Sequence, residues 1–448
     1  MITEAGINYG QKIKADSLKY NMHSWSVQGE LDPKVITRAK GIYFWDTDNN
    51  RYFDMSSQLV NVNIGHGNEK VIDAIKGQAE KLPFIGPAFA VDVKSEAARK
   101  IIEVSPDNMG KVFFTNGGAE ANENAIKVVR MVTGKYKIFS AYRSYHGATY
   151  GAANLTGENR RFSSEPGIPG FVKFVGPYTY RAPIEFKDEE EATKYYLTLL
   201  KDQIEFEGPH RIAAIFQETV VGSNGVLIPP KGWMQGVRDL CDEYGIMMVC
   251  DEVMAGWGRT GKWFAIDNWN VKPDIISFAK GITCGYVPLG GIIVSKEIAK
   301  YFDNNKLWCG LTYSGHPMGC AAACATIDVY REEKLIENSR EMGRVLAEIL
   351  EDLKEKYRCV GDVRCIGLFS AIELVKDKGT KEPLVPYGKD SKGTMKRILS
   401  ILRSEGFWNY SHDNILIIAP PLTIKEAELK EAMDIMDNVL EYVDKEIL

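Results

Sequence analysis

Residues able to do covalent chemistry stand where strand-like runs of this sequence end. Lys280 follows the apolar run DIISFA, and a lysine at the end of a buried strand must be paired or held neutral. Desolvation there would lower its pKa and make the amine a nucleophile able to form a Schiff base with a carbonyl compound. A surface lysine at a turn is the alternative interpretation of this residue taken alone.

Two carboxylates also follow strand-like runs, Glu218 after IAAIFQ and Asp251 after MMVC. An unpaired carboxylate is costly in that position, so each is expected to have a functional role or a nearby donor. Asp251 is suited to hold a protonated ring nitrogen through a charge-assisted hydrogen bond. Metal binding, capping of the next segment and pairing with Arg259 are the alternatives for Asp251.

The stretch TNGGAEANENAIK places two glycines before a helical segment. Free N–H groups at a helix start suit an anion such as phosphate, and Gly117 and Gly118 permit close approach of the backbone. An ordinary glycine turn capped by Asn116 is the alternative. In SYHGATYGA, Tyr145 and His146 could face a flat ring, although a packed tyrosine and a structural histidine would look the same.

Together these residues form a set that no single one of them indicates. A phosphate cradle, a stacking aromatic ring, a carboxylate for a ring nitrogen and a Schiff-base lysine are what a protein provides for pyridoxal phosphate. The sequence therefore predicts a pyridoxal-phosphate site.

The elements that must position these residues are those of an α/β domain. From about Lys111, seven short apolar runs alternate with helical segments, which predicts a mostly parallel sheet buried on both faces and flanked by helices. Ligands of such sheets bind beyond the carboxyl ends of the strands. The residues that follow the strands are therefore expected to converge.

Three parts are predicted along the chain. Residues 1–65 form an N-terminal segment, with a hairpin in GIYFWDTDNNRYFDMS, that contributes to a small domain and to the substrate pocket. Residues 66–330 form the large cofactor-binding domain. Residues 331–448 form a smaller α+β domain that begins with a long charged helix.

Composition narrows the partners and the compartment. The 448 residues carry a net charge of −5, so no basic excess favours nucleic acid. The eight cysteines form no CxxC pair, which favours reduced thiols over disulfides or zinc, and no metal is expected. No signal peptide and no apolar stretch of about 18 residues is visible, so a cytoplasmic protein without a membrane span is expected.

The chain resembles the class III pyridoxal-phosphate-dependent aminotransferases, the ω-aminotransferase group of fold type I. The resemblance extends in order over nearly the whole chain. It is strongest over TNGGAEANENAIK, SYHGATYGA, CDEVMAGWGRTGKWFA, PDIISFAKGITCGYVPLGG and LTYSGHPMGCAAA.

The resemblance implies a role for each matching residue. Lys280 resembles the Schiff-base lysine and Asp251 the partner of the pyridine nitrogen. The other cofactor contacts that it implies are Val253 and Tyr145 on the two ring faces, His146 beside the ring, Gly118 and Ala119 at the phosphate, and Glu218 nearby. Thr312 would reach the phosphate in the neighbouring subunit, which implies a homodimer or a dimer of such dimers.

Departures from the family pattern lie mainly in the substrate pocket. Ala119 stands where relatives often carry a hydroxyl, and Val60 where they often have a large aromatic residue. Tyr410 stands where many relatives have an arginine that grips the substrate carboxylate, so Arg161 is a candidate for that role. Trp25 is placed in the same pocket.

The expected reaction is transfer of an amino group by a ping-pong mechanism. The donor would be an ω-amino acid or primary amine, such as β-alanine, 4-aminobutyrate, taurine, a diamine or an arylalkyl amine. The acceptor would be pyruvate or 2-oxoglutarate. An amino-acid racemase or epimerase on the same fold is the alternative. A nucleotide-binding or non-catalytic module is disfavoured, since TNGGAEAN lacks the GxGxxG spacing while Lys280 and Asp251 are present.

Overall fold

The fold is taken from a computed structural model that describes residues 4–448. No helix within that range is long and apolar enough to cross a membrane. The helices are α1 (Glu4–Tyr20), α2 (Ser57–Val60), α3 (Glu69–Lys81), α4 (Asp92–Glu103), α5 (Gly118–Thr133), α6 (Tyr150–Leu155), α7 (Glu189–Glu207), α8 (Trp233–Tyr244), α9 (Lys296–Tyr301), α10 (Pro317–Glu332), α11 (Leu335–Lys356), α12 (Thr394–Ser404) and α13 (Glu426–Glu446).

A seven-stranded sheet forms the centre of the larger lobe. Its strands are β4 (Met109–Thr115), β5 (Lys137–Ala141), β6 (Phe171–Phe174), β7 (Ile212–Glu218), β8 (Met247–Asp251), β9 (Ile275–Phe278) and β10 (Gly290–Ser295). The order across the sheet is β4-β10-β9-β8-β7-β5-β6. Only β10 pairs antiparallel, with β9 and β4, while the other neighbours are parallel. The predicted α/β class with a mostly parallel sheet is confirmed.

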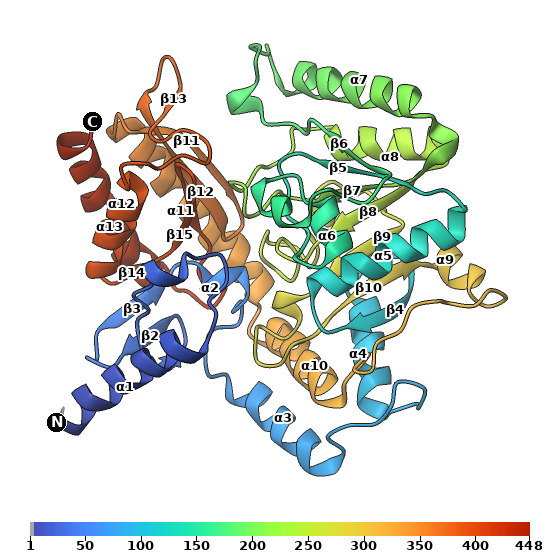
Figure 1. The fold of residues 1–448 in the computed structure, drawn as a ribbon, viewed down its shortest axis with the longest axis horizontal. Coiled ribbons are helices and arrows are strands. Elements are labelled where there is room, and N and C mark those ends of the chain that lie inside the picture. The colour runs from blue at the N-terminus through green and yellow to red at the C-terminus, as the bar shows by residue number, and fades with distance from the viewer. Residues whose placement is uncertain (1–3) are drawn as a thin grey trace.

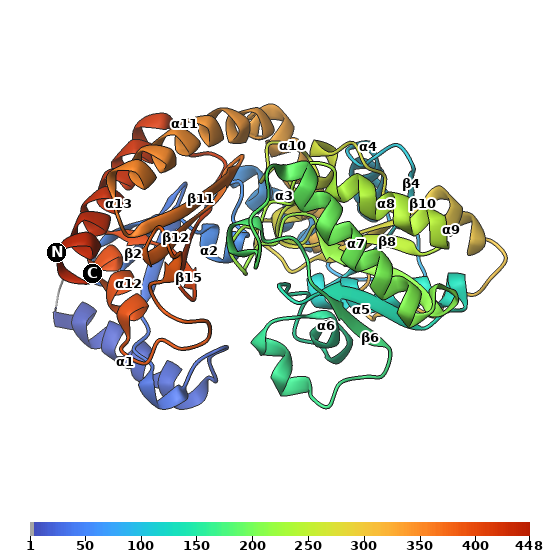
Figure 2. The ribbon, with the colours of Figure 1, turned by 90° about the horizontal axis from the view of Figure 1, so that it is seen from above.

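Both faces of this sheet are covered by helices. Successive residues of a strand point to opposite faces, so Ile275 packs in the cluster that contains Ala125 of α5, and Ile276 packs in the cluster that contains Val237 of α8 and Ala322 of α10. Figures 1 and 2 show α5 on the side of the sheet away from α8. Burial on both sides explains the uninterrupted apolar runs of the sequence.

Two smaller sheets make up the other lobe, which carries both chain ends (Figure 1). One has the order β1-β2-β3-β14 and the other the order β11-β12-β16-β15, with β13 paired to β12. Their strands are β1 (Ile36–Lys40), β2 (Tyr43–Asp46), β3 (Arg51–Asp54), β11 (Val360–Ile366), β12 (Phe369–Asp377), β13 (Glu382–Pro383), β14 (Phe407–Trp408), β15 (Tyr410–His412) and β16 (Ile415–Ile418).

The pairing of β14 with β3 joins the N-terminal part of the chain to its C-terminal part. This pair is parallel, with Phe407 opposite Phe53 and Trp408 opposite Asp54. The N-terminal hairpin expected from the sequence is formed by β2 and β3, and it shares a sheet with a C-terminal strand. The domain limits near residues 65 and 330 remain a prediction.

Candidate active site

One cavity lies at the carboxyl ends of the central strands. Its volume is about 780 Å³. The residues predicted at the strand ends all line it: Tyr145 after β5, Glu218 on β7, Asp251 on β8 and Lys280 after β9. Parallel strands end at the same edge of a sheet, which is why residues so far apart in sequence converge here.

Lys280 adopts an unusual backbone conformation at the start of a short 3₁₀ turn. Its φ angle is +48°, a left-handed conformation that is uncommon outside glycine. Burial lowers the pKa of Lys280 to about 8, although the negative charges of Asp251 and Glu218 oppose that shift. A larger fraction of this amine is therefore neutral near physiological pH than for a surface lysine.

Asp251 is 3% exposed, and hydrogen bonds hold both of its carboxylate oxygens. Oδ2 lies 2.8 Å from Nδ1 of His146 and accepts from Asn122 at 2.8 Å. Oδ1 accepts the N–H of Val253 at 3.0 Å. The carboxylate is thus fixed at the wall of the cavity.

Two observations bear on the alternative interpretations of Asp251. Arg259 donates to the carbonyls of Leu368 and Pro420 and to the side chains of Ser57 and Asn63, so it does not pair with Asp251. Within residues 4–448 no cluster of three His, Cys, Asp or Glu side chains is placed to hold a metal ion.

The N-terminus of α5 opens into the same cavity. Gly117, Gly118 and Ala119 line it, and no side chain caps the helix. The side chain of Asn116 is engaged by Glu120 at 3.0 Å instead. The first N–H groups of a helix lack partners within it, so these are available to an anion such as the phosphate of a cofactor.

Val253 limits what can stand at the start of α5. A Cβ atom added to Gly118 would lie 2.8 Å from both methyl groups of Val253, which is too close for real carbon atoms. The backbone of α5 and the side chain of Val253 are therefore packed as tightly as a glycine permits. The start of α5 and this apolar part of the cavity wall thus pack directly against each other.

Tyr145 presents an aromatic ring to the cavity. Its ring meets that of Trp25 edge to face at a centroid distance of 6.3 Å, and the guanidinium of Arg160 lies 3.7 Å from its centroid. Its backbone N–H donates to Glu218 at 2.8 Å. Burial raises the pKa of Glu218, whose second oxygen accepts the N–H of Gly222 at 2.7 Å.

The predicted substrate-pocket residues divide into two groups. Trp25 and Tyr410 line the cavity, and burial raises the pKa of Tyr410. Val60 is 1% exposed and packs in a core cluster, so it does not line the cavity. Its sequence neighbours Leu59 and Asn61 line the cavity instead.

Arg161 also lies outside the cavity lining. It pairs with Glu165 at 3.2 Å and packs over Phe162, whereas Arg160 lines the cavity. Sequence reasoning missed Arg160, and the only signal was the adjacent pair of arginines. Thr312 is exposed and outside the lining of its own chain's cavity.

The family is decided by comparison with known proteins. The family model described as aminotransferase class-III matches residues 26–440. This chain belongs to the class III aminotransferases. It is a pyridoxal-phosphate-dependent enzyme that catalyses transamination, and the uncapped helix, the buried lysine and the fixed carboxylate fit that cofactor.

Similar proteins span the full length of the chain. A solved taurine:2-oxoglutarate aminotransferase from Bifidobacterium kashiwanohense, in complex with PLP and glutamate, is 48% identical, with a TM-score of 0.96 and coverage of 98% of this chain and 99% of that one. A taurine–pyruvate aminotransferase from Bilophila wadsworthia is 32% identical over 95% of this chain and 96% of its own. A leucine/methionine racemase from Thermococcus litoralis is 33% identical over 92% of each.

Proposed function

We propose that Lys280 and Asp251 are the catalytic residues of this aminotransferase. When bound, pyridoxal phosphate supplies an aldehyde that bonds to amines and a cationic ring that stabilises negative charge on the adjacent carbon. Asp251, oriented by His146 and Asn122, keeps the proton on the ring nitrogen. Lys280 would take up the proton that leaves the substrate Cα, for which a pKa of about 8 is well suited.

The remaining contacts would fix the ring and its phosphate. The N–H groups of Gly118 and Ala119 would hold the phosphate. Tyr145 and Val253 would pack on opposite faces of the ring. Glu218 would act indirectly, because its carboxylate holds the backbone of Tyr145.

We further propose that the substrates carry an acid group close to the reacting carbon. The observation that supports this most directly is Arg160 in the cavity wall. Its Nη2 donates to Ser223 at 2.9 Å and its Nε to Glu158, while Nη1 has no partner within the described residues. A guanidinium forms strong charge-assisted bonds with carboxylates and sulfonates.

The position of Arg160 favours a short substrate. The guanidinium stacks on Tyr145, the residue proposed to face the cofactor, so a bound acid group and the reacting amine lie close together. Taurine as donor and 2-oxoglutarate as acceptor both meet this requirement. The taurine:2-oxoglutarate aminotransferase that is 48% identical to this chain supports the same pair.

A panel of donors and acceptors tests this proposal. Taurine, β-alanine, 4-aminobutyrate, a diamine and an arylalkyl amine are each reacted with the cofactor-loaded enzyme, then with pyruvate or 2-oxoglutarate. In Arg160→Gln, KM for taurine should rise at least about tenfold, while the adjacent Arg161→Gln serves as the matched control. A normal KM in Arg160→Gln, or the same rise in Arg161→Gln, would contradict the assignment.

Amino-acid racemisation is distinguished by leaving out the acceptor. A racemase inverts a single amino acid without an oxo acid, whereas a transaminase stops after one half-reaction. The chain resembles a racemase at 33% identity. Turnover of leucine or methionine without an acceptor would favour the alternative.

We also propose that the enzyme is a homodimer, or a dimer of such dimers. Thr312 is exposed in the single chain, and near it Phe84, Trp308 and Tyr313 expose 39%, 69% and 54% of their surfaces. The rings of Phe84 and Tyr313 lie 5.7 Å apart, which makes part of this surface a contiguous apolar patch of the kind found at interfaces. Light scattering tests the assembly, and Thr312→Ala should weaken cofactor binding if Thr312 serves the neighbouring subunit.

A cytoplasmic location is proposed on the state of the thiols. All eight cysteines are free, and most are buried. Burial raises the pKa of Cys241, Cys320 and Cys365 to about 12, so these thiols are unreactive. Such residues are typical of a reducing compartment. Fractionation of cells that express the chain tests the location.

A further inference from the structure

The short helix α6 directly follows the Tyr145–His146 loop. It has only six residues, Tyr150 to Leu155, and so short a helix is not stable by itself in water. No residue of α6 lines the cavity. Its position must therefore come from tertiary contacts, and charged side chains contact it at both ends.

At its N-terminus, α6 is bound by Glu123 from the phosphate-binding helix α5. Oε1 of Glu123 accepts the N–H of Gly151 at 2.6 Å and that of Ala152 at 3.1 Å. A Cβ atom on Gly151 would collide with this carboxylate. A carboxylate at a helix N-terminus is favourable because it accepts hydrogen bonds from the free N–H groups and its negative charge is attracted to the positive end of the helix dipole.

At its C-terminus, α6 is bound by Lys173 from the edge strand β6. Nζ of Lys173 donates to the carbonyl of Leu155 at 2.9 Å, to Oγ of Ser140 at 2.8 Å and to the carbonyl of Asn154. It forms no ion pair within the described residues, and its facing charged group is Arg161. Burial, and secondarily Arg161, lowers the pKa of Lys173 to about 7, so the amine carries nearly full charge at pH 6.

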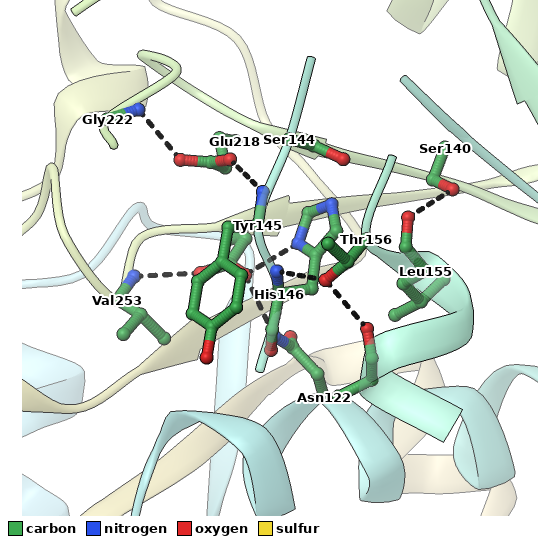
Figure 3. Close-up of polar contacts among 12 residues, drawn as sticks. Asn122, Ser140, Ser144, Tyr145, His146, Leu155, Thr156, Glu218, Gly222 and Val253 are labelled. Atoms are coloured by element: carbon green, nitrogen blue, oxygen red, sulfur yellow. Dashed lines mark hydrogen bonds and ion pairs between the residues drawn. The ribbon is translucent and has the colours of Figure 1, made fainter. Parts of the chain in front are cut away.

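The C-terminal end of α6 is connected to the cofactor cavity by hydrogen bonds, which Figure 3 shows. Thr156, the residue after α6, accepts the backbone N–H of His146 on Oγ1 at 2.9 Å and donates to the carbonyl of Ala152 at 3.1 Å. The ring of His146 in turn contacts Asp251. A shift of α6 would therefore move the histidine that orients the catalytic carboxylate.

We propose that Glu123 and Lys173 are positioning residues that hold α6 by its two ends and thereby fix His146 against Asp251. The proposal rests on the roles at the cofactor that were proposed above for His146 and Asp251. It assigns a function to two charges that contact neither substrate nor cofactor.

A merely structural lysine offers a matched control. Lys137, on the neighbouring strand β5, donates to the carbonyl and the carboxylate of Glu207 at the C-terminus of α7. It too is mostly buried, with 16% of its side chain exposed, but no residue of α7 lines the cofactor cavity.

The test compares Lys173→Met, Glu123→Gln and Lys137→Met with the native enzyme at pH 6. The measurements are the dissociation constant of pyridoxal phosphate for the apoenzyme, the visible spectrum of the bound cofactor with its pH midpoint, and the melting temperature of the apoenzyme. Loss of either end should weaken cofactor binding about tenfold and shift the midpoint. Lys137→Met should lower only the melting temperature.

Either of two results overturns the proposal. One is a dissociation constant and midpoint within about twofold of native in Lys173→Met or in Glu123→Gln. The other is an equal change in Lys137→Met. If Lys173→Met does not fold, Glu123→Gln at its half-buried site decides alone. Failure of the cofactor assignment itself would instead appear as normal transamination by Lys280→Ala.

Discussion

Nδ1 of His146 and Oδ2 of Asp251 lie 2.8 Å apart in a part of the molecule where each of the two residues is 3% exposed. Asn122 donates to the same oxygen, so the plane of the carboxylate is set before any cofactor binds. A carboxylate oxygen accepts more than one hydrogen bond, which leaves capacity for a ring N–H. Because the carboxylate is already oriented, it does not have to rearrange during the reaction.

Replacing Asp251 with asparagine should separate cofactor binding from catalysis. The amide keeps the shape but lacks the negative charge that holds a proton on the ring nitrogen. The value of kcat should fall on the order of 10²–10³-fold, while cofactor affinity changes less than about tenfold. Single-turnover spectra with a good donor measure both. A near-normal kcat would show that Asp251 has no role at the ring nitrogen.

The pKa of Lys280 predicts a pH dependence for cofactor loading. Only the neutral amine reacts with the aldehyde, so the loading rate of the apoenzyme should rise about tenfold per pH unit below the pKa and level off near pH 8. The free amine of N-acetyl-lysine is the reference, and its rate should keep rising toward pH ~10.4. A common profile for the two amines would contradict the lowered pKa.

The same shift has a consequence for stability. The folded-state pKa is about 8 and the ordinary value is 10.5, so between these values the unfolded chain binds more protons than the folded one. The free energy of unfolding of the apoenzyme should therefore gain a contribution from Lys280 as the pH rises through this window. Lys280→Met should remove that contribution, which urea titrations at pH 8 and 10 detect.

Gly118 and Val253 should behave as a coupled pair. In Gly118→Ala the new methyl group would press on both methyl groups of Val253, at 2.8 Å, and displace the start of α5. Cofactor affinity should fall about tenfold or more, and Val253→Ala should restore part of it. Equilibrium dialysis measures the affinities, and a double variant no better than Gly118→Ala would argue against steric conflict as the cause.

Arg259 should contribute to stability without touching the cofactor. It is fully buried, and burial lowers its pKa to about 10, so it stays charged near neutral pH. It donates to carbonyls of Leu368 and Pro420 in the C-terminal part and to Asn63 in the N-terminal part. Arg259→Met leaves buried carbonyls unpaired, so the free energy of unfolding should fall by about 3 kcal/mol or more.

A surface arginine provides the control for Arg259. The side chain of Arg358 is 74% exposed, its ion pair with Asp444 is 3.7 Å long, and its Nη2 donates to the carbonyl of Asp444 at 2.9 Å. Because contacts this exposed contribute little, Arg358→Met should change the free energy of unfolding by less than about 1 kcal/mol. Urea midpoints of the two variants measure the difference. Equal midpoints would mean that the carbonyls around Arg259 find other donors.

Much of the fold follows from local patterns in the sequence. The seven runs expected to be strands are the seven strands of the central sheet, because strands buried on both faces must be apolar throughout. The hairpin at β2 and β3 was equally visible. Helix α7 was not predicted, although Asp188 caps it by accepting the backbone N–H of Glu191.

The residues of the cavity also divide into those that local sequence patterns predict and those that they do not. The sequence by itself determined that Lys280, Asp251, Glu218 and Tyr145 meet, since each follows a strand and parallel strands end at one edge. Only the tertiary structure decided that Arg160 rather than Arg161 lines the cavity, and that Leu59 and Asn61 do so rather than Val60.

The physical reason is that these choices depend on irregular backbone. Arg160 lies in a 3₁₀ turn, and positive φ angles occur at Ser57, Gln58 and Val60, so no regular period relates one side chain to the next. Helical and strand periodicities predict which face a residue occupies only where the backbone repeats. In this enzyme the sequence determines which reactive side chains gather at the strand ends, and the tertiary structure determines which other side chains line the cavity around them.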